Sequence, residues 1–250
     1  MRKKRTIIIL LVVSPKASGM CSLTSTTARN WIERIGRIGI ITGRESMMWH
    51  WEDGMTLLIW YKNDDGKMVS YKYSGGNTGN SNSFVKDVIT AYNYNVANGG
   101  GENMQAIATD KKMRIGVVET GYDNVYLPNA NAIRFNPTAG LKLDDGNILS
   151  PATGLEHEAA HAVNNKKGVD SKIDNKYGTT EERSVIKGAE LKTAKANGEL
   201  PVNHPGRKSH ADGQWIVTRS VISNKEFSTK SSEELRKKIK EFRNSYTPEP

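Results

Sequence analysis

The sequence is poor in cysteine and in apolar residues. Of its 250 residues, only Cys21 is a cysteine, so an intrachain disulfide and a zinc cage built from several cysteines are both excluded. Hydrophobic residues make up 36% of the chain, which favours a modest core with long polar loops. A metal site in this chain must therefore use histidine and carboxylate side chains.

The N-terminal apolar run, Ile7 to Val13, is too short to span a bilayer as a helix. It follows a basic start and precedes small residues that lead to Cys21, as in a secretory signal. Cys21 stands where bacterial lipoproteins carry a lipidated cysteine, although Met20 replaces the Gly or Ala of that motif. We expect residues 1–21 to be a signal-like or lipoprotein-like segment of a secreted or cell-envelope protein, and any membrane contact to be made through this segment alone. The alternative is an incidental strand with basic flanks.

The chain carries a surplus of positive charge, with 36 Lys and Arg against 27 Asp and Glu, a net charge of +9. Such a surplus favours acidic partners, such as nucleic acid, anionic lipid or an acidic substrate protein. Much of it lies in the first five residues and in the C-terminal tail. For the bulk of the chain, a solvated and mildly basic surface is the simpler interpretation, and nucleic acid is not expected as the partner.

Two β-rich segments predict a hairpin near the start of the main domain. Met55 to Tyr61 is apolar, Lys67 to Tyr73 alternates apolar and polar residues, and Asn63 to Gly66 between them is a strong turn signal. After the hairpin, apolar residues recur at helical spacing over Phe84 to Val96, with Ser83 as a natural N-cap.

The rest of the chain predicts an α+β fold with a small mixed sheet. We expect strands at Arg114–Glu119 and Ala132–Phe135, a short helix at Asn103–Ala108, and helices at Thr180–Ala196 and Ser231–Phe242. The predicted layout is a signal-like segment at 1–21, a linker at 22–48, a main domain at 49–225 with the hairpin module at 49–74, and a basic C-terminal helix and tail at 226–250.

A helix that begins after Ser150, a good N-cap, carries the pattern His-Glu-x-x-His. His157 and His161 are one turn apart, so both imidazoles project from one face and can bind a single zinc ion. Glu158 lies beside the first ligand, where its carboxylate can take a proton from a water whose pKa zinc lowers toward about 7. Two alternatives are a chance match on a surface helix and a metal-free histidine pair. The second would leave Glu158 as a buried charge without a partner.

A catalytic zinc site needs a third protein ligand. Glu182 and Glu181 open the next predicted helix, and either one would complete a His-His-Glu set of the thermolysin type. The other candidates are Asp170, Asp174, Glu190 and a loop histidine. For the glutamate that is not the ligand, the simple role is to complement the helix dipole.

A peptidase of this kind also needs a group that stabilises the oxyanion of the tetrahedral intermediate. His204 and Tyr177 are our candidates, with His210 and Arg207 nearby in the sequence, because an imidazolium, a guanidinium or a phenol can donate to an oxyanion. For each of them, an ordinary loop position is the alternative.

Three stretches carry a resemblance to a known family: Ala132–Pro137 (AIRFNP), Gly154–His161 (GLEHEAAH) and Thr180–Gly188 (TEERSVIKG). Over roughly residues 55–220, the sequence resembles the NleD-like effector zinc metallopeptidases, and related domains form the C-termini of Rhs-type polymorphic toxins. The resemblance implies a zincin-like domain that binds zinc through His157 and His161 and uses Glu158 as its base. It also implies a bacterial protein, secreted or injected into a target cell, that cleaves a protein substrate and has a target or immunity protein as partner.

The sequence therefore predicts a gluzincin-like zinc peptidase. In zincins a strand at the edge of the sheet lies along the substrate, and here we expect the strand ending at Phe135 to be that edge, because a peptide can add to a free edge by main-chain hydrogen bonds. Two rival hypotheses are a basic nucleic-acid-binding toxin module and a metal-free surface lipoprotein.

Overall fold

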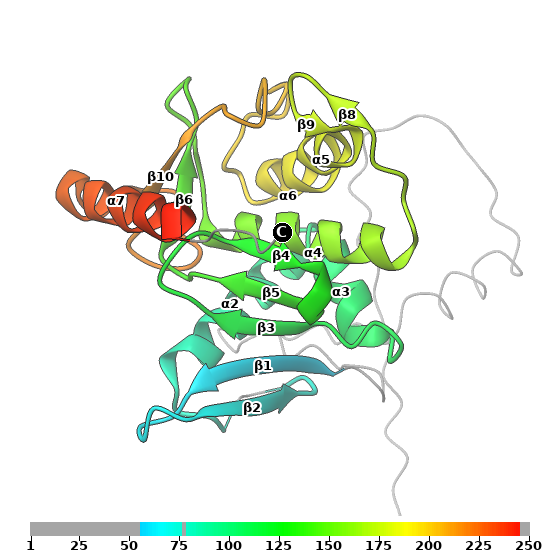
Figure 1. The fold of residues 1–250 in the computed structure, drawn as a ribbon, viewed down its shortest axis with the longest axis vertical. Coiled ribbons are helices and arrows are strands. Elements are labelled where there is room, and N and C mark those ends of the chain that lie inside the picture. The colour runs from blue at the N-terminus through cyan, green and yellow to red at the C-terminus, as the bar shows by residue number, and fades with distance from the viewer. Residues whose placement is uncertain (1–55, 77–78, 246–250) are drawn as a thin grey trace, which may run out of the picture. The chain divides into compact units, whose positions relative to one another are not determined.

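The computed structural model describes residues 56–76 and 79–245 (Figure 1). The predictions for the signal-like segment 1–21 and the linker 22–48 lie outside the described residues. All the described residues belong to one compact unit. Among them, no helix has both the length and the apolar character needed to cross a membrane.

A five-stranded mixed sheet has the strand order β2-β1-β3-β5-β4 (Figure 1). β1, β3 and β5 are parallel, while β2 and β4 run antiparallel to their neighbours at the two edges. The bounds are Leu57–Lys62 (β1), Met68–Tyr73 (β2), Gly116–Glu119 (β3), Val125–Leu127 (β4) and Ala132–Phe135 (β5). The predicted hairpin is confirmed as β1 and β2, and its turn contains Gly66 at a φ of 73° that suits glycine.

β5, which ends at Phe135, is an interior strand of the sheet, since it pairs with β3 on one side and β4 on the other. The prediction that this strand forms the free edge is therefore wrong. The edge is β4, a three-residue strand that pairs with β5 alone. A strand this short shows too little alternation for its sequence to reveal it.

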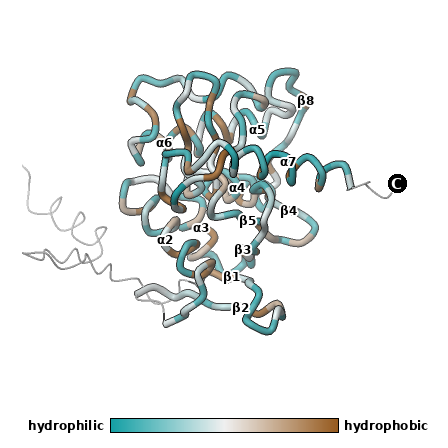
Figure 2. The backbone as a smooth tube through the Cα atoms, turned by 90° about the vertical axis from the view of Figure 1, so that its left-hand side faces the viewer, coloured by the Kyte–Doolittle hydropathy of each residue, from teal (hydrophilic) through white to brown (hydrophobic). Residues whose placement is uncertain are grey.

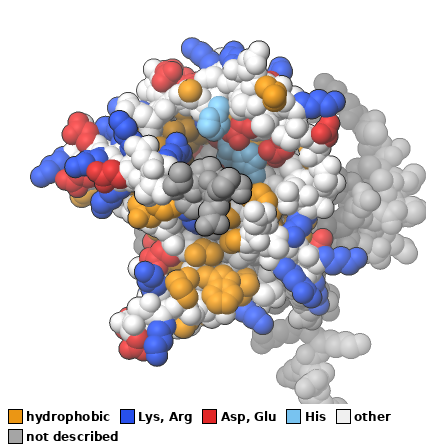
Figure 3. Space-filling view, in the orientation of Figure 1, with side chains coloured by type: hydrophobic (Ala, Val, Ile, Leu, Met, Phe, Trp, Pro, Cys, Tyr) orange, Lys and Arg blue, Asp and Glu red, His pale blue; other side chains and the backbone are white. Residues whose placement is uncertain are grey.

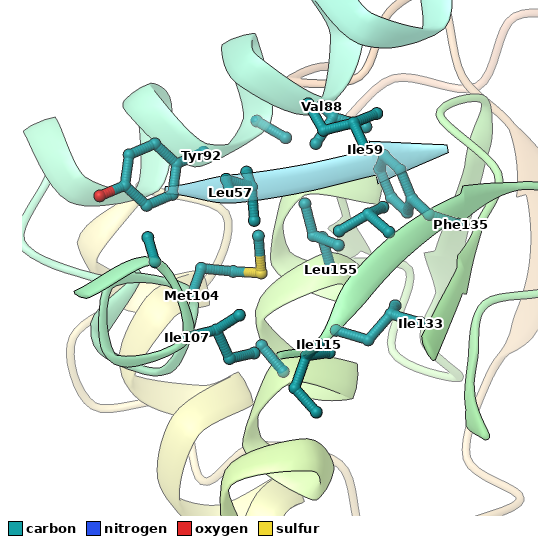
Figure 4. Close-up of a cluster of buried hydrophobic side chains, with 14 of the residues drawn as sticks. Leu57, Ile59, Val88, Tyr92, Met104, Ile107, Ile115, Ile133, Phe135 and Leu155 are labelled. Atoms are coloured by element: carbon teal, nitrogen blue, oxygen red, sulfur yellow. The ribbon is translucent and has the colours of Figure 1, made fainter. Parts of the chain in front are cut away.

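Helices α2 (Ser83–Ala97), α3 (Glu102–Thr109) and α4 (Pro151–Lys166) pack against one face of this sheet and close the main core (Figures 1 and 4). The predicted helix after residue 83 is confirmed, but its N-cap is Asn82, whose side chain accepts a hydrogen bond from the amide of Val85. α4 buries Leu155, Ala159 and Ala162 completely in this core. Each large apolar side chain buried in this way contributes roughly 1.5–3 kcal/mol, so the core fixes the rotation of α4 about its axis.

A second set of elements faces α4 from the other side. It contains a three-stranded sheet of β6 (Ala139–Lys142), β7 (Ile148–Leu149) and β10 (Gln214–Val217), and the short pair β8 (Ile173–Asp174) and β9 (Gly178–Thr179). The 3-10 turn η1 (Pro128–Ala130) belongs to the main sheet, where it connects β4 to β5. The helix predicted over residues 180–196 is present as α5 (Thr180–Val185), the π-helical turn η2 (Ile186–Glu190) and α6 (Leu191–Ala196). The fold is thus a mixed α+β fold with small sheets.

The C-terminal helix α7 (Thr229–Ser245) is mostly hydrophilic (Figure 2) but packs on β10 through one apolar side. Leu235 and Ile239 are buried there against Ala139. The predicted basic helix is therefore part of the same compact unit as the rest of the described chain.

Candidate metal centre

The N-terminus of α4 is held by a buried carboxylate. Ser150 is the N-cap, as predicted, and its hydroxyl accepts from the amide of Thr153 at 3.3 Å. Glu199 accepts hydrogen bonds from the Ser150 hydroxyl at 2.5 Å, the Ser150 amide at 3.1 Å and the Thr153 hydroxyl at 2.8 Å. Burial raises the pKa of Glu199 to about 7 although these hydrogen bonds lower it. The start of the helix is therefore tied to the segment that follows α6.

A second buried carboxylate, Glu156, joins α4 to α3. It accepts from the amide of Asn103 at 2.6 Å and the amide of Met104 at 3.1 Å, which are free donors in the first turn of α3. Burial raises the pKa of Glu156 to about 7, again against these hydrogen bonds. With its core face, its N-terminus and Glu156 all fixed, α4 presents the residues of its remaining face in a defined direction.

His157 and His161 on that face meet Glu182 from α5. The two Nε2 atoms lie 3.0 Å apart, and Glu182 places one oxygen 2.9 Å from Nε2 of His161 and the other 3.6 Å from Nε2 of His157. Two nitrogens bound to one tetrahedral zinc ion at about 2.0–2.1 Å lie roughly 3.3 Å apart. The three side chains therefore have the spacing of a metal-binding group.

The other nitrogen of each imidazole faces a carboxylate. Nδ1 of His161 lies 2.8 Å from Glu181, and Nδ1 of His157 lies 2.8 Å from Glu190. A carboxylate next to Nδ1 favours the tautomer with its proton there, which leaves a lone pair on Nε2. Two lone pairs and a carboxylate then converge on one point. Such a set of acceptors is suited to a cation.

Glu182 supplies a further sign of fit to a metal ion. Its Oε1 atom is buried, and among the described residues it has no hydrogen-bond partner. Nitrogens of His157, Arg207 and His210 lie 3.6–3.8 Å from it, too far for a hydrogen bond. A buried carboxylate oxygen without a hydrogen bond is costly, and a divalent cation held by the three side chains would satisfy it. The donor set of two imidazoles and one carboxylate is that of catalytic zinc sites.

The two adjacent glutamates have different positions in the structure. Glu182 reaches the histidine pair, while Glu181 contacts Nδ1 of His161 and accepts from the side chain of Asn164 at 2.7 Å. Of the two candidates for the third ligand, the structure brings Glu182 into the group and places Glu181 behind His161. Glu190, a minor candidate for the ligand, lies behind His157.

The π turn η2 explains why Glu182 and Glu190 both face α4. In a regular α-helix, residues eight apart point about 80° away from each other around the axis. A π turn acts as one inserted residue, so these two glutamates stand to each other as residues seven apart, a difference of roughly 20°. Helical periodicity does not reveal this turn. Gly188, a weak helix former inside it, is the sequence feature that hints at it.

The electrostatics of the group favour positive charge. Burial disfavours the charged form of His161, but hydrogen bonds to Glu181 and Glu182 outweigh it and raise the pKa of His161 to about 10. Burial also works against ionised Glu190, yet the charge of Arg207 and the contact with His157 lower the pKa of Glu190 to about 2. The carboxylates that favour the extra proton on His161 would favour a metal cation at the same place for the same electrostatic reason.

Glu158 lies at the same site, in an open cleft. Its Oε2 accepts a 2.7 Å hydrogen bond from the amide of Tyr126 on the edge strand β4. The cleft has a volume of about 710 Å³ and is lined by residues of β4, the exposed face of α4, the glutamates of α5 and η2, and the loop before β10. Figure 3 shows histidine and acidic side chains side by side in a hollow on this face.

The structure does not bring His204 and Tyr177 into this cleft. The hydroxyl of buried Tyr177 donates to the carbonyl of Arg207 at 3.3 Å, and Nε2 of His204 lies 2.6 Å from Asp145. Their polar atoms are thus engaged elsewhere. Of the four oxyanion candidates, His210 and Arg207 do line the cleft. The side chain of His210 is 64% exposed, whereas the guanidinium of Arg207 is bound to Glu190.

Comparison with known proteins identifies no relative of this chain. No family model matches the chain, and no curated protein or solved structure matches it. The function is therefore argued from the geometry and chemistry of the cleft.

Proposed function

We propose that the chain is a zinc-dependent peptidase with a zincin-like, gluzincin-type domain. His157, His161 and Glu182 hold the zinc ion, and Glu158 is the general base. The observation that carries the proposal is the convergence of two imidazole Nε2 atoms and the carboxylate of Glu182 on one point, beside a second carboxylate, that of Glu158, in an open cleft.

When bound there, zinc polarises a substrate carbonyl and lowers the pKa of water toward about 7. Glu158 is placed to handle the proton. The amide of Tyr126 holds its Oε2, which fixes the carboxylate plane and leaves Oε1 to accept a proton from water and to pass it to the leaving amine. A positioned proton-transfer group of this kind contributes about 10²–10⁴-fold in rate.

The edge strand β4 supports a polypeptide as substrate. In an antiparallel strand, the N–H and C=O of one residue point to the same edge. Because the amide of Tyr126 points to Glu158 rather than to β5, its carbonyl also faces the cleft side. An extended segment of substrate can add there by main-chain hydrogen bonds. His210, exposed in the same cleft, is the candidate donor to the oxyanion.

The resemblance of the sequence to NleD-like effectors extends the proposal to the biological setting. It favours a secreted or injected bacterial protein that cleaves a protein of another cell.

The test combines metal analysis with cleavage of a proteome-derived peptide library. We expect about one zinc per purified chain, cleavage that stops with a chelator and returns with zinc, and no cleavage by Glu158→Gln with its zinc retained. A wild-type protein that binds no zinc, or a Glu158→Gln variant that cleaves normally, would overturn the proposal.

A further inference from the structure

Arg207 is a buried arginine that reaches the metal centre from the loop before β10. Its exposed fraction is 7%. Nε donates to Oε1 of Glu190 at 2.8 Å and Nη2 donates to Oε2 at 2.7 Å, so the pair is a two-point fork. Oε2 is also the atom that lies 2.8 Å from Nδ1 of His157. One carboxylate oxygen is therefore shared between the guanidinium and a ligand imidazole.

Two further contacts link the same guanidinium to the rest of the cleft. Nη2 lies 3.8 Å from Oε1 of Glu182, the carboxylate oxygen without a hydrogen-bond partner. Nη1 donates to the carbonyl of His210 at 3.2 Å. Arg207 thus contacts the carboxylate behind the first histidine, approaches the ligand carboxylate, and holds the loop that brings His210 to the cleft.

The backbone of Arg207 is fixed as firmly as its side chain. Its carbonyl accepts from Nζ of Lys187 at 2.7 Å and from the hydroxyl of Tyr177 at 3.3 Å. Lys187 and Glu190 belong to the same π turn. This turn therefore contacts Arg207 twice, at its backbone carbonyl through Lys187 and at its guanidinium through Glu190. The planar guanidinium then has little freedom to move away from the two glutamates.

We propose that Arg207 is a positioning residue that sets the zinc affinity of the site. It holds Glu190 against His157 and keeps Glu182 directed at the histidine pair. The inference rests on the proposed function, because it concerns the affinity of the zinc site. Removal of an outer partner that orients a metal-binding histidine costs about 10–100-fold in metal affinity.

The experiment measures the zinc dissociation constant by competition with a chelating dye. We expect Arg207→Met to weaken zinc binding about 10–100-fold, and Arg207→Lys to fall between it and the wild type, since lysine keeps the charge but loses the fork. The cobalt(II)-substituted Arg207→Met protein should show an altered visible spectrum, which a merely structural role would not produce. Arg183→Met is the matched control, because Arg183 lies next to Glu182 in the chain but its side chain is 62% exposed and pairs with Asp174. This control should bind zinc within about twofold of the wild type.

Arg207→Met leaves Glu190 buried without its counter-charge and is at risk of misfolding. The double variant Arg207→Met/Glu190→Gln removes both charges, so it should fold while still binding zinc weakly. If the wild type binds zinc and the folded double variant and Arg207→Lys bind it equally well, the positioning role is wrong. If the wild type itself binds no zinc, the proposed function fails instead.

Discussion

The amide of Tyr126 donates a 2.7 Å hydrogen bond to the carboxylate of Glu158. Tyr126 lies on the edge strand β4 and Glu158 on the helix α4, so one bond joins the strand that we expect to receive substrate to the group that we expect to move the proton. The direction of the carboxylate is then set by the sheet as well as by the helix. This makes the length of the side chain at position 158 critical.

Glu158→Asp is expected to lower kcat by about 10²–10⁴-fold while the bound zinc stays the same. The side chain is shorter by one methylene, so its carboxylate cannot accept from Tyr126 and reach the cleft at once. Peptide cleavage assays with metal analysis check this. Glu102→Asp, a change at an exposed glutamate paired with Lys192, is the control and should leave both quantities unchanged. Near-normal turnover by Glu158→Asp would show that the hydrogen bond does not set the geometry.

The two neighbouring glutamates of α5 should differ in their effect on zinc. Glu182→Ala removes the proposed third ligand and leaves only the two histidines, so zinc should be lost on dialysis. Glu181→Gln removes only the carboxylate behind His161 and should weaken zinc binding about 10–100-fold. The zinc content after dialysis against buffers of defined free zinc distinguishes the two variants. The opposite order would make Glu181 the ligand.

The stability of the protein should fall with rising pH through Glu199. Its carboxyl has a pKa of about 7 in the folded chain and 4.5 as its ordinary value. Between these values the folded state keeps a proton that the unfolded state has released, so the free energy of unfolding declines as pH rises, by about 1.4 kcal/mol per pH unit, or roughly 3 kcal/mol in all.

Urea unfolding at pH 4.5 and pH 8 measures this effect. The Glu199→Gln variant has no titrating group at position 199. Its free energy of unfolding should therefore fall less between pH 4.5 and pH 8 than that of the wild type, by about 3 kcal/mol. The difference between the two proteins isolates Glu199 from other titrating groups, Glu156 among them. Parallel pH profiles for the two proteins would mean that burial does not raise this pKa.

Much of the site is local in the sequence and was therefore predictable. The N-cap Ser150 and the four-residue spacing of His157 and His161 place both rings on one face of a helix without any knowledge of the fold. Glu182 follows from the need for a carboxylate on a second helix, although the sequence does not separate it from Glu181. The hairpin is likewise set by a local turn.

The rest depends on contacts between distant segments. β4 is too short for its pattern to predict a strand, and its place at the sheet edge is decided by pairing with β5. The role of Glu190 depends on a π turn that shifts it onto the face of Glu182. The partner of Glu190, Arg207, comes from a loop 17 residues away, so neither spacing nor periodicity connects them.

The last prediction separates the residues that line the cleft from those that the sequence alone suggested for the oxyanion. His210→Ala removes an exposed donor from the cleft and should lower kcat by about 10²–10³-fold, the usual effect of losing one oxyanion donor. Tyr177→Phe loses only the hydrogen bond to the carbonyl of Arg207, which should cost about 1 kcal/mol of stability with little change in kcat. Thermal unfolding and cleavage kinetics on both variants check the pair, with His204→Ala as a second control outside the cleft. A large drop in kcat for Tyr177→Phe, without a matching loss of stability, would mean that the Tyr177 hydroxyl takes part in the reaction. Because this hydroxyl donates to the carbonyl of Arg207, such a role would require the loop around Arg207 to rearrange when substrate binds.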